Sequence, residues 1–184
     1  LSVPLHLTDG LMARPMMAVL KDDGTPYTVY TPYSRRWRQQ VPLQRSDILP
    51  APEQLPGPTS MASDDLPESD AANELSFVPG EGEAKQRLAA FVAGPDAPVY
   101  GYANHRNRPD LEGTAQLSPY LRFGMISARL AALAAYTAIE RAPDADSRQS
   151  ADTWLAELIW REFYISILHH FPHVRRGSFR PEYD

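Results

Sequence analysis

The sequence contains no cysteine, which excludes disulfide bonds, thiolate metal sites and cysteine nucleophiles. It also lacks any run of about 20 apolar residues that could span a bilayer. Even the apolar run 131–135 lies among Arg129, Thr137 and Glu140. The N-terminus has no basic region followed by an apolar block and a small-residue cleavage site, so no secretory signal is expected. These absences predict a cytoplasmic protein without a membrane segment.

Positive charge is in deficit, because 18 lysines and arginines face 23 aspartates and glutamates, for a net charge of -5. This balance argues against a protein that is basic all over, but a DNA-binding protein needs only a local basic surface. The 184 residues are 43% hydrophobic and 22% charged, with a mean hydropathy of -0.40. That composition is typical of a folded globular chain with one sizeable core.

Proline is concentrated in one stretch, since residues 41–80 hold seven of the 18 prolines together with the acidic residues Asp64, Asp65, Glu68 and Asp70. Proline lacks a backbone donor, and this polar composition disfavours regular structure. A loop of this length is unusual inside a compact domain. The stretch is therefore predicted to be a linker that runs over the surface between two domains.

The remaining pattern predicts a mainly α protein. Residues 25–37 begin with alternating β-prone residues and then become basic, which predicts a short extended piece running into a helix. Further along, apolar residues recur at helical spacing, and serine, proline and glycine mark the ends. Four helices are expected there: one after Gly82 that stops at Gly94-Pro95, a short one capped by Ser118 that Gly124 ends, an alanine-rich one from Ser127 to Pro143, and one from near Ser147 to His170.

The last helix carries charges although apolar residues occur on all its sides, so it is expected to be buried in the middle of the helical domain. At about 100° per residue, Glu157, Trp160, Arg161 and Tyr164 fall on one side. One interpretation is an ordinary ion pair between Glu157 and Arg161, one turn apart. The other is a wall of a ligand site, because burying charges is costly without a partner or a polar ligand.

A second candidate site is the loop that follows Tyr102 and runs from Arg106 to Ser118. It passes through Gly113 into hydroxyl residues at the start of a helix, where free backbone amides and the helix dipole suit a phosphate. The loop could grip a diphosphate. The alternative is a turn followed by an ordinary Ser-Pro helix cap.

Three histidines near the end of the last helix, His169, His170 and His173, suggest a metal site. However, no carboxylate stands at a recognised spacing, and Glu162 lies too far before them for the two-histidine zinc motif. No metal is predicted.

Two of these segments resemble the motifs of one family, the DNA photolyases and cryptochromes. Residues 113–124, GTAQLSPYLRFG, resemble the family's G-T-S-x-L-S-P-x-L-x-F-G, and residues 154–164, WLAELIWREFY, resemble its W-L-x-E-L-I-W-R-E-F-Y. Residues 28–33 followed by Trp37 resemble the V-F-T-P-F stretch and tryptophan that leave the family's N-terminal α/β domain. The resemblance covers residues 25–184 and is greatest to class I cyclobutane pyrimidine dimer (deoxyribodipyrimidine) photolyases.

The resemblance implies a division of the chain. Residues 1–24 would be the end of the α/β antenna domain, residues 25–80 the interdomain linker, and residues 81–184 the N-terminal half of the all-helical FAD-binding domain. The chain is therefore expected to be a fragment that lacks the antenna domain and the C-terminal half of the FAD domain. An antenna pigment of folate or deazaflavin type belongs to the full-length family member, and its identity here is unknown.

Carried over residue by residue, the resemblance also implies two sets of site residues. FAD would be held by Tyr102, Thr114, Ala115, Gln116, Leu117, Ser118 and Arg161. DNA containing a pyrimidine dimer would be contacted by Arg106, Glu157, Trp160, Arg161 and Tyr164. Ala115 departs from the family's usual serine but keeps the backbone amide, and Asn107 stands where many members have aspartate.

The implied function is light-driven repair of cyclobutane pyrimidine dimers by a monomeric protein, through electron transfer from reduced FAD. No catalytic triad is needed, because the flavin supplies the redox chemistry. One alternative is a cryptochrome-type photoreceptor that signals to protein partners. Another is that these 184 residues alone are an inert piece that cannot hold FAD.

Overall fold

The computed structural model describes residues 10–54, 57, 62, 64–65 and 77–183. All regular structure in these ranges is helical, without a strand, which confirms the mainly α fold class. No helix in the described ranges is long and apolar enough to cross a membrane. The α-helices are α1 (Tyr30–Arg38), α2 (Glu81–Val92), α3 (Tyr102–His105), α4 (Ser118–Arg122), α5 (Ala128–Arg141) and α6 (Ala145–His170). Short 3-10 turns lie at Met16–Ala18, Arg45–Asp47, Pro98–Gly101, Pro172–Arg175 and Pro181–Tyr183.

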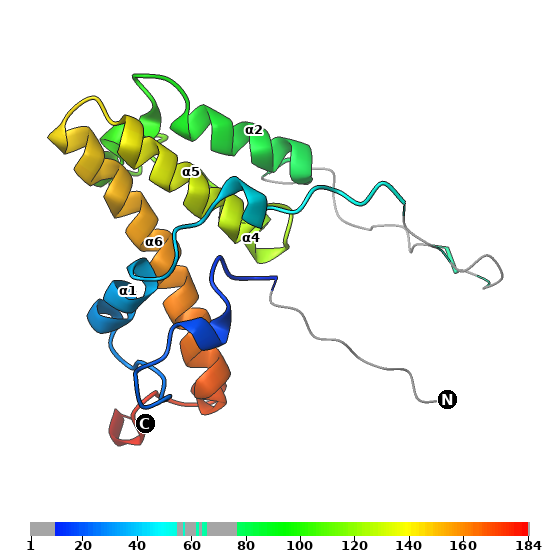
Figure 1. Ribbon diagram of the computed structural model, residues 1–184, viewed down its shortest axis with the longest axis vertical. Helices are drawn as coiled ribbons and strands as arrows, with labels where there is room; N and C mark the ends of the chain where they lie inside the picture. The colour runs from blue at the N-terminus through cyan, green and yellow to red at the C-terminus, as the bar shows by residue number, and fades with distance from the viewer. Residues whose placement is uncertain (1–9, 55–56, 58–61, 63, 66–76, 184) are drawn as a thin grey trace.

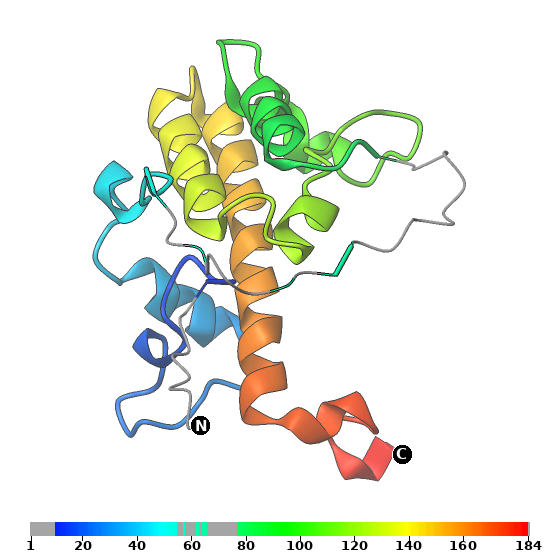
Figure 2. The same ribbon diagram turned by 90° about the vertical axis from the view of Figure 1, so that its right-hand side faces the viewer.

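Helix α6 is the axis of the molecule. Its 26 residues run through the centre of the fold, with α2, α4 and α5 around its N-terminal half and α1 beside its C-terminal half (Figures 1 and 2). It begins two residues before the expected Ser147, because Asp144 accepts a hydrogen bond from the Ser147 backbone N–H at 2.7 Å and caps the helix. It ends at His170, as predicted.

Alanine allows α5 to lie close to α6. The α5 residues Ala131 and Ala135 are fully buried, as are Leu155 and Ile159 of α6. Ser127 caps α5 as predicted, because its Oγ accepts the N–H of Arg129 at 3.2 Å. Small side chains bring the helix backbones together, so one continuous core forms between the two helices.

Helix α1 lies within the stretch predicted to be a linker, yet it packs into this same core. Its Tyr33 and Trp37 are fully buried. The expected extended piece before it is limited to Val29, whose backbone is extended at the N-cap, and no strand forms over residues 25–29. The predicted domain boundaries stay predictions. Residues 30–38 nevertheless belong to the same packed core as α5 and α6.

The buried carboxylate of Glu162 joins three parts of the chain. It accepts hydrogen bonds from the Trp37 ring N–H at 2.6 Å, from the Arg14 backbone N–H at 3.4 Å and from the Ala13 backbone N–H. Burial raises the pKa of the Glu162 carboxyl, while these donors and Arg161 oppose the rise. Residues 13–14, α1 and α6 are held together at this point.

Candidate functional site

Both segments singled out in the sequence line one cavity of about 1090 Å³. This volume is slightly above the roughly 300–1,000 Å³ typical of small-molecule sites. Nine of the expected site residues line it: Tyr102, Thr114, Ala115, Gln116, Leu117, Ser118, Glu157, Arg161 and Tyr164. Arg106 and Trp160 do not line it. The tertiary fold therefore brings together two motifs that the whole of α5 separates in the sequence.

Gly113 determines how closely the loop approaches α3. A Cβ added to Gly113 would lie 2.6 Å from the Cβ of His105 and 2.7 Å from the His105 carbonyl oxygen. Only glycine fits this approach without displacing backbone. The loop that follows is consequently held against α3, beside Tyr102.

Side chains alternate along this loop. Ala115 and Leu117 are buried, while Thr114, Gln116 and Ser118 are exposed. The hydroxyls of Thr114 and Ser118 are thus on the solvent side of the loop, where a ligand could reach them. The buried Ala115 side chain leaves only its backbone amide for such a contact.

The predicted N-cap position of the short helix is wrong by one residue. Leu117 is the N-cap of α4 and Ser118 is its first residue, with no side-chain capping bond. Pro119 lies in the first turn as expected, and Gly124 follows the helix at a φ of 69°. Because Ser118 caps nothing, its hydroxyl is not used by the helix end.

The ion pair between Glu157 and Arg161, one of the two interpretations of the sequence, does not form. Glu157 instead receives a hydrogen bond from Arg106 Nη1 at 2.6 Å, and the Arg106 guanidinium lies 5.6 Å from the centre of the Tyr102 ring. Both partners are about one third exposed. Two of the five side chains assigned to DNA contacts, Arg106 and Glu157, are therefore paired with each other.

Arg161 is held by backbone carbonyls. Its Nη1 donates to the carbonyl of Leu11 at 2.7 Å and its Nη2 to that of Leu121 at 3.1 Å. Burial lowers the pKa of Arg161, but an arginine stays charged at neutral pH. Arg161 thus connects α6 to α4 and to the N-terminal segment, and it is part of the cavity wall.

Trp160 is directed toward α1. Its ring stacks on Tyr30 with centroids 3.5 Å apart and an interplanar angle of 7°, and Tyr30 donates a hydrogen bond to the Ala156 carbonyl at 2.9 Å. Tyr164 stacks on Trp160 at 5.6 Å and is 63% exposed. The aromatic side chain of this group that faces the cavity is Tyr164, with Trp160 behind it.

The expectation that α6 is buried on all sides is therefore wrong for its C-terminal half. Tyr164 and Leu168 are 63% and 46% exposed and form part of the cavity wall. The periodicity of a single helix does not reveal which side faces a cavity.

Several lining residues were not anticipated from the sequence. Arg122 is exposed, lines the cavity, and makes no ion pair within the described ranges. It stands one turn after Ser118 on α4, a helical spacing that could have identified it. The remaining wall is mostly apolar: Leu11, Leu121, Trp154, Leu158, Ile165 and Leu168.

The charge and polarity of the cavity suit a large, partly apolar anion. Two arginines, Arg122 and Arg161, face the cavity, whereas its carboxylate, Glu157, is neutralised by Arg106. The hydroxyls of Thr114 and Ser118 add hydrogen-bonding groups beside these cations. A dinucleotide with a diphosphate and flat rings fits this set of groups.

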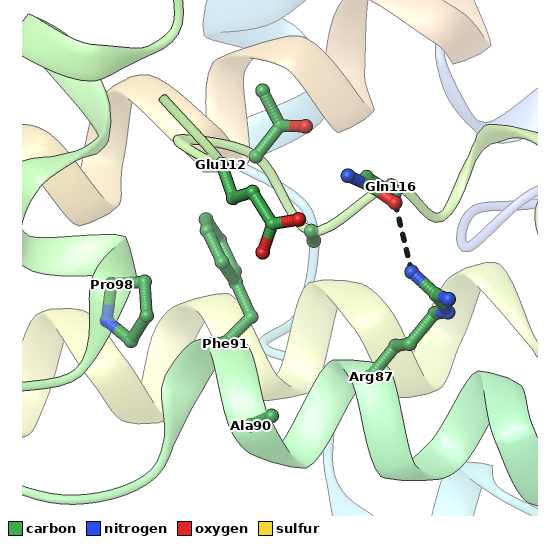
Figure 3. A pocket seen from close by; sticks show the side chains of 8 residues that line it. Arg87, Ala90, Phe91, Pro98, Glu112 and Gln116 are labelled. Carbon is green, nitrogen blue, oxygen red and sulfur yellow. Dashed lines mark hydrogen bonds between the residues drawn. The ribbon is translucent and has the colours of Figure 1, made fainter. Parts of the chain in front are cut away.

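A second, smaller cavity of about 320 Å³ lies between the loop and α2 (Figure 3). Residues 114–116 line both cavities. The loop thus borders both cavities.

The histidines at the end of α6 do not assemble a metal site in the described ranges. The rings of His169 and His170 meet edge to face at 4.8 Å, and no group of three histidine, aspartate or glutamate side chains suited to a metal is found there.

Comparisons with known proteins place the chain among photolyases, although no family model matches it. It is 38% identical over its whole length to a deoxyribodipyrimidine photo-lyase of Thermus thermophilus. It is 34% identical over 96% of its length to the protein of that name from a Synechococcus species. The chain spans 38% of the length of each of these relatives.

A solved structure agrees with this result. The crystal structure of a bacterial class III photolyase from Agrobacterium tumefaciens matches 95% of the chain with a TM-score of 0.71 and 25% sequence identity. The match covers 36% of that photolyase chain. The class I assignment made from the motifs stays a prediction.

Proposed function

Because this chain belongs to the photolyase family, we propose that it forms one wall of the FAD and lesion site of an enzyme that repairs cyclobutane pyrimidine dimers in DNA with light. The chain spans 38% of its photolyase relatives, so the activity of the whole protein is part of the proposal. The observation that carries it is that both motif segments line the same cavity of about 1090 Å³.

The residues of the loop would hold the FAD diphosphate. Thr114 and Ser118 offer hydroxyls on its exposed side, and the cations Arg122 and Arg161 line the same cavity. Hydrogen bonds between charged groups and phosphate are roughly twice as strong as neutral ones. The bound flavin would supply the light absorption and the electron that opens the dimer, which explains why no nucleophile is required.

The C-terminal half of α6 would contact the lesion. A pyrimidine dimer taken out of the duplex needs an aromatic surface to replace the lost stacking. The exposed Tyr164 ring, supported from behind by Trp160, provides one. Arg106 occupies only one acceptor position of the Glu157 carboxylate, so Glu157 would accept a hydrogen bond from a pyrimidine while the pair persists. The remaining N–H donors of Arg106 would contact a DNA phosphate.

The photolyase names of the relatives support the enzyme over the photoreceptor alternative, since neither relative is named as a cryptochrome. A monomeric state and a cytoplasmic location stay predictions made from the sequence, as does the type of antenna pigment.

Binding of FAD is tested by titrating the purified protein and following flavin fluorescence. Arg122→Ala is expected to weaken binding by about tenfold, which corresponds to a loss of roughly 1.4 kcal/mol from one charge-assisted contact. Arg148→Ala is the matched control, because Arg148 is an exposed arginine of α6 that does not line the cavity. Equal effects of the two substitutions would contradict a specific role of Arg122.

Repair is tested on a dimer-containing oligonucleotide with reduced FAD, under blue light and in the dark. Loss of dimers that depends on light supports the proposal. FAD binding without light-dependent repair, in a protein of the relatives' full length, would overturn it and favour a photoreceptor.

A further inference from the structure

The loop that borders both cavities contains an unusual backbone conformation. Gln116 has a φ of 50°, and within the described ranges no other residue except glycine has a positive φ. Residues with a Cβ adopt positive φ in only a few per cent of cases, because the side chain then crowds the backbone. An interaction of the Gln116 side chain that favours this conformation would offset the cost of the crowding.

Arg87 of α2 supplies that interaction. Its Nη1 donates an exposed hydrogen bond to Gln116 Oε1 at 2.9 Å, and both side chains line the smaller cavity, as Figure 3 shows. The two residues are 29 positions apart in the sequence. The side chain of the strained residue is thus tied to a separate helix.

Arg87 is itself fixed in place. Its Nε donates to Glu83 Oε1 at 2.7 Å, one turn earlier on α2, and its guanidinium lies 5.9 Å from the centre of the Tyr120 ring. Tyr120 is fully buried, and its hydroxyl donates to the Val78 carbonyl at 2.6 Å. The planar guanidinium can serve both Glu83 and Gln116 because its donors point in fixed directions.

We propose that Arg87 is a positioning residue that holds Gln116 in its left-handed conformation and so keeps the loop 114–118 shaped for the FAD diphosphate. This inference rests on the proposed FAD site. Arg87 does not line the larger cavity, so it acts through Gln116 and not by contact with the cofactor there. If only a fraction of molecules has the loop in the binding conformation, the apparent affinity falls by that fraction.

A double-mutant cycle with Arg87→Ala and Gln116→Gly tests the proposal, with FAD affinity as the readout. In the Gln116 background, Arg87→Ala is expected to weaken FAD binding roughly tenfold, because an unsupported residue with a Cβ rarely keeps positive φ. In the Gln116→Gly background the same substitution should cost about twofold or less, because glycine adopts either sign of φ with similar ease. Arg87→Lys keeps the positive charge but lacks the several fixed donors of the guanidinium, so it should also weaken FAD binding.

Lys85→Ala is the matched control. Lys85 forms an ion pair with Glu81 at 2.6 Å, also one turn apart on α2, but it does not line either cavity beside the loop. No change in FAD affinity is expected. An equal loss from Arg87→Ala in both backgrounds, or no loss in the Gln116 background, would overturn the proposal.

A measurement without FAD separates this inference from the proposed function. The NOE between the amide and α protons of residue 116 is strong at positive φ, and it should weaken in Arg87→Ala and remain in Lys85→Ala. An unchanged NOE in Arg87→Ala refutes the role of Arg87 whether or not FAD binds. If the parent protein binds no FAD, the proposed function fails, while the NOE still decides whether Arg87 sets the backbone of Gln116.

Discussion

Replacing Gly113 by alanine is expected to lower the free energy of unfolding by about 1–3 kcal/mol, the usual cost of overpacking. The added Cβ would lie 2.6 Å from the Cβ of His105, 2.7 Å from its carbonyl oxygen and 2.8 Å from its carbonyl carbon. Because two of these atoms belong to the backbone, rotating the His105 side chain cannot relieve the contact. Either α3 or the loop that begins at Thr114 must move.

Gly82→Ala is the matched control. Gly82 lies in the first turn of α2, and a Cβ there would meet no atom within 4 Å. Glycine inside a helix is less stable than alanine by roughly 0.5–1 kcal/mol. The control substitution is therefore expected to leave stability unchanged or to raise it slightly, opposite in sign to Gly113→Ala.

Urea unfolding followed by far-UV circular dichroism measures both changes, and flavin titration measures the effect on the cavity. Gly113→Ala should also weaken FAD binding, because the displaced loop carries Thr114 and Ser118. A Gly113→Ala protein as stable as the parent would show that the loop does not approach α3 this closely. Lost stability with unchanged FAD affinity would separate the packing of Gly113 from the shape of the site.

Two further predictions concern α6. Tyr30→Phe should lower the free energy of unfolding by about 1 kcal/mol, because the hydrogen bond to the Ala156 carbonyl is lost. Tyr30→Leu should lower it by about a further 0.5–1.5 kcal/mol, because the stack on Trp160 is also lost. Equal urea midpoints for the two variants would exclude a contribution from the stack. Burial lowers the pKa of His170, with His169 adding to the effect, so stability should be lost as pH falls below the ordinary value of 6.5 toward the lowered pKa. An NMR titration of the His170 ring with a midpoint at or above 6.5 would refute this.

The sequence was sufficient to predict the larger helices, because the caps and the apolar spacing that mark them are local signals. Ser127 caps α5 and the apolar spacing after Gly82 gives α2, as predicted. Helix α3 was not anticipated, since no capping side chain marks its start. Its position depends on Ser150 of α6, whose Oγ accepts the Ala103 backbone N–H at 2.8 Å across 47 residues.

In the candidate site, too, local sequence signals predicted some features and contacts between distant residues decided the others. The two motifs identified most of the polar lining residues, because each motif is continuous in the sequence. The motifs did not reveal that Glu157 pairs with Arg106 and not with Arg161, because the spacing of four residues permits a bond within the helix without requiring it. Nor did the motifs reveal that Trp160 stacks on Tyr30 and does not line the cavity, because Tyr30 belongs to a segment predicted to be a linker.

By itself, the sequence determined the helical class, the family resemblance and the two segments that build the cavity, since helical periodicity and continuous motifs are properties of neighbouring residues. Only the tertiary structure decided which groups are free to meet a ligand. Glu157, Arg161 and Gln116 each have a partner 29 or more residues away in another helix or segment. Such pairings depend on how the helices pack, and packing is a property of the whole chain.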